Sequence, residues 1–138
     1  MPETVFTKIL NREIPAHIVY EDDLVLAFLS IEPINHGHTL VIPKKPFVNL
    51  FDGDSEALAH MMRVGQKVAL ALKATKLGEG VNLIMNNGKE AGQEVFHAHL
   101  HVVPRNTNDS ALVKPKHVSN PEAKFDIVKE KLKNALAN

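Results

Sequence analysis

Short apolar runs separated by turn residues dominate the first third of the chain. Ile18-Val19-Tyr20 and the run from Leu24 to Leu29 flank Glu21-Asp22-Asp23. This pattern predicts a β-hairpin with an acidic turn. Thr39-Leu40-Val41-Ile42 follows a segment rich in strand-breaking residues, and Pro43 comes directly after it. Because proline removes a donor from the strand ladder, we expect a third strand that ends at this point.

The spacing of apolar residues changes to three and four between Ser55 and about Lys76. Such a stripe is typical of an amphipathic α-helix. Asp54 or Ser55 suits the N-cap, and Gly78 is the expected C-terminal stop. Several alanines widen the apolar surface, so the helix either packs only on its own sheet or also forms a dimer interface. The stripe consists of Leu58, Met61, Gly65, Val68 and Leu72.

The second half of the chain predicts two more strands and another helix. The strands run from Val81 to Met85 and from Val95 to Val103, on either side of a turn-rich loop. Asn120 as the cap and Pro121 in the first turn begin a helix that reaches about Leu136. The strands cluster without regular βαβ alternation, which indicates the α+β class. We expect an antiparallel β-sheet with one long helix packed on it, plus a C-terminal helix.

Length and composition describe one ordinary domain. The chain has 138 residues, no cysteine, and 16 Lys+Arg against 16 Asp+Glu. We expect a single domain over residues 1–138, with a core at about 4–105 and a polar loop and C-terminal helix at 106–138. The lack of cysteine excludes thiol catalysis, and the balanced charge argues against a nucleic-acid partner. No segment is typical of a signal peptide or a membrane span, so a cytoplasmic protein without a membrane partner is expected.

Histidines alternate with apolar residues at positions 97, 99 and 101. On a strand, alternate side chains share a face, so we expect His97, His99 and His101 to lie together. Successive imidazoles would then be about 6.5 to 7 Å apart. The opposite face would cover the core with Phe96, Ala98, Leu100 and Val102.

Three interpretations of this histidine row are open. It is an exposed polar face without a function, a metal site, or a site for chemistry at a phosphate. Three neighbouring positions on one straight strand diverge too far for tetrahedral zinc, whereas neutral imidazole can be both nucleophile and hydrogen-bond donor. The preceding loop favours phosphate chemistry, because Gly88 and Gly92 allow close backbone approach and Asn86 and Gln93 can bond to phosphate or sugar oxygens.

The chain resembles the histidine-triad superfamily of nucleotide hydrolases and transferases. The signature of that family is His-φ-His-φ-His-φ-φ, where φ is an apolar residue, and residues 97–103 meet it. The resemblance covers about residues 4–105 and implies a homodimer that joins two sheets. Further family-like segments are Phe6 to Ile9, Arg12 to Pro15, Val19 to Phe28, Gly37 to Lys44 and Asn86 to Gln93.

The resemblance implies a covalent mechanism. His99 would attack the α-phosphorus of a purine nucleotide and form a nucleotidyl-histidine intermediate that water then hydrolyses. His101 would contact the phosphate or assist the leaving group, and His97 would orient His99 through its backbone carbonyl. His38 resembles a fourth histidine that lies beside the triad. The implied nucleotide-binding residues are Phe6, Ile9, Phe28, Ser30, Ile31, Asn86, Gly92, Gln93 and Glu94.

Three features depart from the best-known branch of the family, the phosphoramidases. Ser30 stands where that branch has an Asp that holds the ribose hydroxyls, and Glu94 stands where Ser or Thr is common. Bacterial relatives often bind zinc through two cysteines near the N-terminus, and Thr4 and Thr7 occupy those places. We therefore expect no metal and no cofactor.

Hydrolysis of purine nucleoside phosphoramidates at the α-phosphate is the function that the resemblance favours. Two alternatives stay open. Gly92-Gln93 and Val103-Pro104-Arg105 also occur in dinucleoside polyphosphate hydrolases, whose second nucleotide would need positive charge near Arg105. A nucleotide-binding module with little turnover is also compatible with the sequence.

Overall fold

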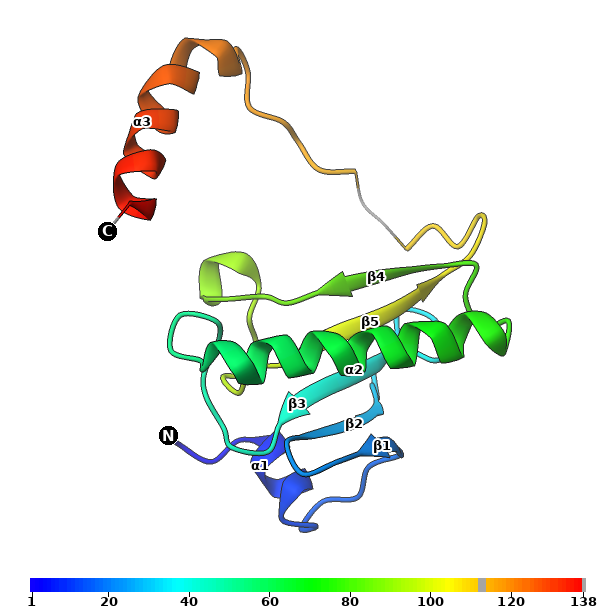
Figure 1. Cartoon of the computed structure of the whole chain (residues 1–138). Coiled ribbons are helices and arrows are strands. Elements are labelled where there is room, and N and C mark those ends of the chain that lie inside the picture. Colours follow the sequence, from blue (N-terminus) through cyan, green and yellow to red (C-terminus); the bar gives the residue numbers. More distant parts are fainter. Residues whose placement is uncertain (112–113, 138) are drawn as a thin grey trace.

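The computed structural model describes residues 1–111 and 114–137. Five antiparallel strands form one sheet in the order β1-β2-β3-β5-β4 (Figure 1). The expected antiparallel sheet with one long helix and a C-terminal helix is confirmed. The strands are β1 (Ile18–Glu21), β2 (Val25–Leu29), β3 (Thr39–Pro43), β4 (Gly80–Ile84) and β5 (Leu100–Arg105). The α-helices are α1 (Val5–Leu10), α2 (Ser55–Ala74) and α3 (Phe125–Leu136).

The central strands β2 and β3 are buried on both faces. Val25, Ala27 and Val41 belong to the core cluster under α2, whereas Leu26 and Phe28 belong to a second cluster with the α1 side chains. Because both faces are covered, these strands have unbroken apolar runs instead of an alternating pattern. The sequence analysis anticipated a helix on one face only, and α1 covers part of the other.

The long helix α2 lies across one face of the sheet (Figure 1). Asp54 is its N-cap, and the Asp54 side chain accepts a hydrogen bond from the Ala57 N–H at 3.1 Å. A Cβ atom at Gly65 would lie 2.8 Å from Cδ2 of Leu100. The missing side chain therefore lets α2 approach β5, the strand that carries His101.

The expected stop of α2 at Gly78 is wrong. The helix ends at Ala74, and Lys76 takes the left-handed conformation with φ of 63°. Gly78 has a different role, because a Cβ atom there would lie 2.8 Å from Cβ of Pro104 and 3.0 Å from the Gly80 carbonyl oxygen. It allows the connection to β4 to cross close to β5.

The expected strand from Val95 to Val103 is also wrong at both ends, since β5 begins at Leu100 and ends at Arg105. Phe96, which was expected in the core, is 45% exposed. The alternation of faces nevertheless extends ahead of the strand, because Ala98 is buried in the α2 cluster together with Leu100 and Val102. Because β5 begins only at Leu100, His97 and His99 lie in the segment that precedes the strand.

Helix α1 was not predicted. Thr4 and Thr7 form a capping box, in which the Thr4 side chain accepts from the Thr7 N–H and Thr7 Oγ1 accepts from the Thr4 N–H. The helix buries Phe6 and Ile9 against the sheet. A helix of six residues has too few turns to show a periodic stripe, which is why the apolar pattern did not reveal it.

Helix α3 follows an extended segment and a 3₁₀ turn at Pro121–Lys124, away from the sheet (Figure 1). The helix is confirmed, but its α-helical part begins later than expected. Asn120 makes no side-chain capping hydrogen bond and has φ of 51°. None of the α3 side chains is buried within the described structure. No helix in residues 1–111 and 114–137 combines the length and apolarity needed to span a membrane.

Gly78 and Gly80 make a matched test of this packing. We expect Gly78→Ala to lower the free energy of unfolding by about 1–3 kcal/mol, because its methyl group would press against Pro104. Gly80→Ala should change that free energy by less than about 0.5 kcal/mol, since nothing lies within 4 Å of a Cβ at this position. Urea denaturation of both variants measures the difference, and equal effects would contradict the proposed role of Gly78.

Candidate active site

A cavity of about 490 Å³ lies between α1, the outer ends of β2 and β3, and the segment that leads into β5. Its walls bring together ten of the thirteen residues that the sequence analysis assigned to the site. The ten are Phe6, Ile9, Phe28, Ser30, Ile31, Asn86, Gly92, Glu94, His99 and His101. The remaining three, His38, His97 and Gln93, lie behind these walls and contact residues that form them.

The protonation of His99 follows from its backbone contact. Its Nδ1 lies 2.8 Å from the His97 carbonyl oxygen, which can only accept. Nδ1 therefore carries the hydrogen in the neutral ring, and Nε2 keeps its lone pair. Phe6 packs edge-on against the ring, with centroids 5.0 Å apart. His99 is thus a buried imidazole held in one tautomer, with a basic nitrogen that makes no hydrogen bond within the described structure.

A second chain of hydrogen bonds fixes the tautomers of His38 and His101. The backbone N–H of Ile34 donates to Nδ1 of His38 at 3.0 Å, so the His38 hydrogen is on Nε2. That Nε2–H donates to Nδ1 of His101 at 2.9 Å. The hydrogen of neutral His101 is therefore on Nε2. His99 is a lone-pair donor, whereas His101 is a hydrogen-bond donor, and their ring centroids are 4.9 Å apart.

His97 does not line the cavity. Its side chain is fully buried, and Nε2–H donates to the Pro43 carbonyl oxygen at 3.0 Å, at the end of β3. Its Nδ1 has no hydrogen-bond partner among the described residues. His97 therefore anchors the segment whose carbonyl accepts the hydrogen bond from His99.

Burial lowers the pKa of all four histidines. Removal from water disfavours the charged ring in His38, His97 and His99, and it is the largest cause in each. For His101 the same burial, followed by the neighbouring His99 and His38, lowers the pKa to about 4. The cluster is therefore neutral at pH 7.

Gln93 shapes the loop before the triad instead of lining the cavity. Its buried Oε1 accepts from Asn49 Nδ2 at 3.0 Å and from the Gly88 N–H at 2.9 Å. Its Nε2 donates to the carbonyl oxygens of Val48 and Val95. All of its hydrogen-bonding positions are thus used within the protein, and the expected contact with phosphate or ribose is not supported by this placement.

The other loop residues face the cavity. Gly92 has φ of 90°, a conformation that favours glycine, and a Cβ atom there would lie 3.8 Å from Nδ2 of Asn86. Ser30 Oγ accepts from the Glu32 N–H at 3.2 Å. Ile31 is 92% exposed, so it lies at the open rim of the cavity.

Several residues of the site gave no signal in the sequence. Asn49, which holds Gln93, lies in a loop without a motif, and its place depends on long-range contacts. Glu32 and Val95 also line the cavity. A search for polar loop residues near the predicted strand ends would have included Glu32 and Asn49, together with many residues that lie elsewhere.

The described residues contain no group of three or more His, Cys, Asp or Glu side chains arranged to hold a metal ion. Five of the eight ring nitrogens in the histidine cluster make hydrogen bonds to carbonyls, to a backbone N–H or to each other within the described structure.

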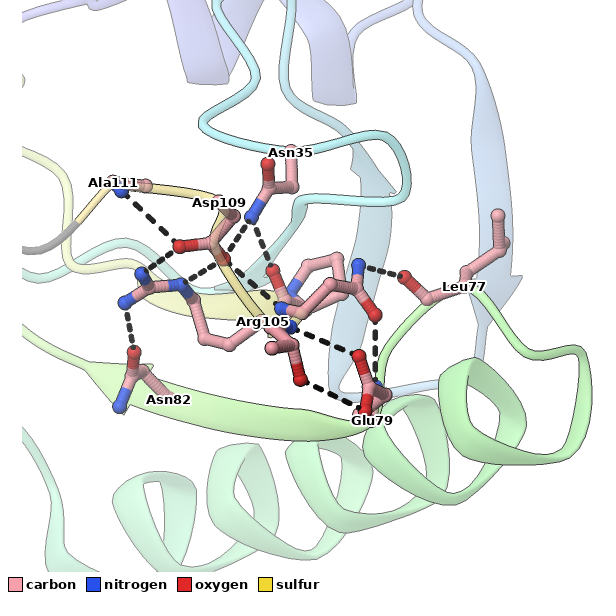
Figure 2. A network of polar contacts seen from close by, with 10 residues as sticks. Asn35, Leu77, Glu79, Asn82, Arg105, Asp109 and Ala111 are labelled. Carbon is pink, nitrogen blue, oxygen red and sulfur yellow. Dashed lines mark hydrogen bonds and ion pairs between the residues drawn. The ribbon is translucent and has the colours of Figure 1, made fainter.

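Arg105, the residue on which a second nucleotide would depend, is already paired (Figure 2). Its guanidinium makes two hydrogen bonds to Asp109 and one to Asn82. Asp109 also accepts from Nδ2 of Asn35 and from the Ala111 N–H. The same network holds Asn106 and Thr107 against Glu79. The positive charge of Arg105 therefore stabilises the end of the domain and does not line the cavity.

The site can perform nucleophilic chemistry on a phosphate. His99 offers a lone pair, His101 offers an adjacent N–H, and the loop glycine allows close approach. An antiparallel sheet that presents such histidines beside a cavity with an aromatic and aliphatic wall is the arrangement expected of the histidine-triad superfamily.

The chain belongs to the HIT domain family, which matches residues 11–108. An uncharacterised HIT-like protein of Methanocaldococcus jannaschii is 47% identical over 117 residues, which are 84% of this chain and 89% of that protein. This membership supports a nucleotide-binding or hydrolase-like function.

Solved structures agree with this assignment. A crystal structure from Streptococcus mutans has a TM-score of 0.90 and 36% identity, and the match covers 99% of this chain and 87% of that one. A histidine triad nucleotide-binding protein from Candida albicans has a TM-score of 0.86 and 33% identity, with 98% of both chains covered.

The lowered pKa values give stability a defined dependence on pH. In the unfolded chain a histidine has a pKa near the ordinary value of 6.5, whereas in the folded protein the pKa of His101 is about 4. Between these values the unfolded chain holds more protons. The free energy of unfolding should therefore fall as the pH drops from about 6.5 toward 4, as urea denaturation at several pH values would measure.

His101→Gln is the matched variant for that measurement. It removes one group with a lowered pKa, so the fall in stability between these pH values should be less steep. A fall as steep as in the unmodified protein would contradict the assignment.

Proposed function

We propose that this protein hydrolyses purine nucleoside phosphoramidates at the α-phosphate, as in the phosphoramidase branch of the family. The observation that carries the proposal is the His97 carbonyl bond to Nδ1 of His99, which leaves Nε2 as a nucleophile. The low pKa of His99 keeps this nitrogen free of a proton at neutral pH. The aromatic and aliphatic wall opposite, which includes Phe6, Ile9 and Phe28, suits a purine base.

The reaction has two steps. The lone pair of His99 Nε2 forms a bond to the α-phosphorus as the bond from phosphorus to the leaving nitrogen breaks. The nitrogen takes up a proton from the solvent and departs as the amine, and the water of the second step returns a proton to the solvent. Water then attacks the phosphorus, breaks its bond to His99 and releases the nucleoside monophosphate. In sum one water is consumed, with its hydroxyl group on phosphorus and its proton on the amine. His101 Nε2–H donates to a phosphate oxygen or to the leaving atom through both steps.

Dinucleoside polyphosphate hydrolysis has less support. Its second nucleotide would bring several phosphates that need cationic partners, and Arg105 is held by Asp109. The next experiment distinguishes catalysis from the remaining alternative, a nucleotide-binding module with little turnover.

His99→Asn should lower the hydrolysis of adenosine 5′-phosphoramidate by about 1,000-fold or more, because no other described group offers a lone pair at this place. Intact-mass spectrometry of the quenched reaction should show one nucleotidyl group on the unmodified protein and none on the variant. His36→Asn, an exposed histidine in a loop, is the control and should retain activity.

The outcomes differ in what they contradict. No adduct and no turnover in the unmodified protein would favour a binding module. Equal turnover in the unmodified protein and in His99→Asn would exclude His99 as the nucleophile.

We also propose that two copies pair through β4. In the described sheet β4 pairs with β5 alone, so its other edge is open. Leu83 on this strand is 38% exposed, and Met62 and Ala69 of α2 line the same hollow beside it. An open edge beside exposed apolar side chains is a surface that a second sheet can cover.

Leu83→Lys tests this interface, because it places a charge at the centre of the proposed contact. Light scattering should give the mass of a dimer for the unmodified protein and of a monomer for the variant. Val19→Lys, on the opposite edge strand β1, is the control and should stay dimeric. A monomeric unmodified protein at micromolar concentration would exclude the interface.

A further inference from the structure

Glu94 lies at the boundary between the loop and the triad, and it has no role in the mechanism above. It is exposed and lines the cavity together with His99, His101 and Gly92. No hydrogen bond or ion pair from the Glu94 side chain to another described residue holds it away from the cavity. Its carboxylate is therefore available to a bound ligand.

The charged side chains that line the described part of the cavity are all negative. Its described lining contains two carboxylates, Glu32 and Glu94, and neither lysine nor arginine. The four histidines are neutral at pH 7 because burial lowers the pKa of each. A site for a phosphate thus presents hydrogen-bond donors but no full positive charge.

This arrangement has a direct electrostatic consequence. A substrate with several negative charges meets repulsion from the carboxylates, and no cation compensates for it. A substrate with a single phosphate charge meets less repulsion, and a positive charge on its leaving group interacts favourably with Glu94. The cavity therefore discriminates between leaving groups by their charge.

We propose that Glu94 determines leaving-group specificity, so that the site prefers an α-phosphate substituent that carries an ammonium group and disfavours an anionic one. The inference rests on the proposed hydrolysis. Glu94 takes no part in the bond changes: phosphorus exchanges its bond to the leaving nitrogen for a bond to His99, as above. Glu94 contributes through the electrostatic interaction of its carboxylate with the charge on the leaving group.

Three adenosine 5′-phosphoramidates of similar size test the proposal. Their amine substituents are 3-aminopropyl, butyl and 2-carboxyethyl, which carry a remote charge of plus one, zero and minus one. We expect kcat/KM to decrease in that order. The cationic substrate should exceed the neutral one by about fivefold or more, which corresponds to two unit charges 4 Å apart in bulk water. Added salt should reduce the difference.

Glu94→Gln should bring the three kcat/KM values together, with a gain for the anionic substrate and a loss for the cationic one. Glu94→Asp keeps the charge and should keep the order. Glu90→Gln removes a carboxylate from the same loop at an exposed position that does not line the cavity, so it should leave all three values unchanged.

The results separate this inference from the proposed function. If the three substrates are hydrolysed at equal rates by the unmodified protein, or if Glu94→Gln keeps the original order, the role of Glu94 is excluded while the hydrolysis stands. If none of the three is hydrolysed and His99→Asn behaves like the unmodified protein, both proposals fail.

Discussion

One backbone carbonyl determines what the histidine row can do. An imidazole in water exchanges its hydrogen between two nitrogens, and only one of the two tautomers leaves Nε2 with a lone pair. The His97 carbonyl removes this freedom from His99. It can do so because the His97 ring is itself anchored to the end of β3 through Pro43. The chemistry of the site thus depends on a rigid link between two segments that are far apart in the sequence.

Burial keeps the His97 and His99 rings in their neutral forms at neutral pH, so that the tautomer of His99 is the one set by the His97 carbonyl. A hydrogen bond to a carbonyl favours the protonated imidazole, in which Nε2 of His99 would carry a proton instead of a lone pair. Desolvation acts in the opposite direction and is the larger effect for His97 and His99, so their pKa values are lowered. The packing of Phe6 from α1 against both rings contributes to this dry environment. A short helix without catalytic groups is therefore part of the electrostatics of the site.

The sequence predicted the parts of the fold that are periodic or marked by turns. The stripe of α2, the hairpin of β1 and β2 and the row of histidines all have local signals. The limits of β5 and the burial of Gln93 do not, because they depend on contacts across the sheet. Helix α1 was missed because it is too short to show a periodic stripe. Gln93 is the clearest case: its amide has the right chemistry for a phosphate ligand, and the fold uses all of it to hold the Asn49 and Gly88 segments together.

The network around Arg105 also marks where the cooperative unit of the chain ends. Asp109 accepts hydrogen bonds from the N–H groups of Asn106 and Ala111, and Asn35 links it to the connection between β2 and β3 (Figure 2). Beyond Ala111, the described side chains are exposed, so their replacement removes no packing from the sheet. Substitutions in α3 should therefore leave the packing of the sheet and the geometry of the cavity unchanged.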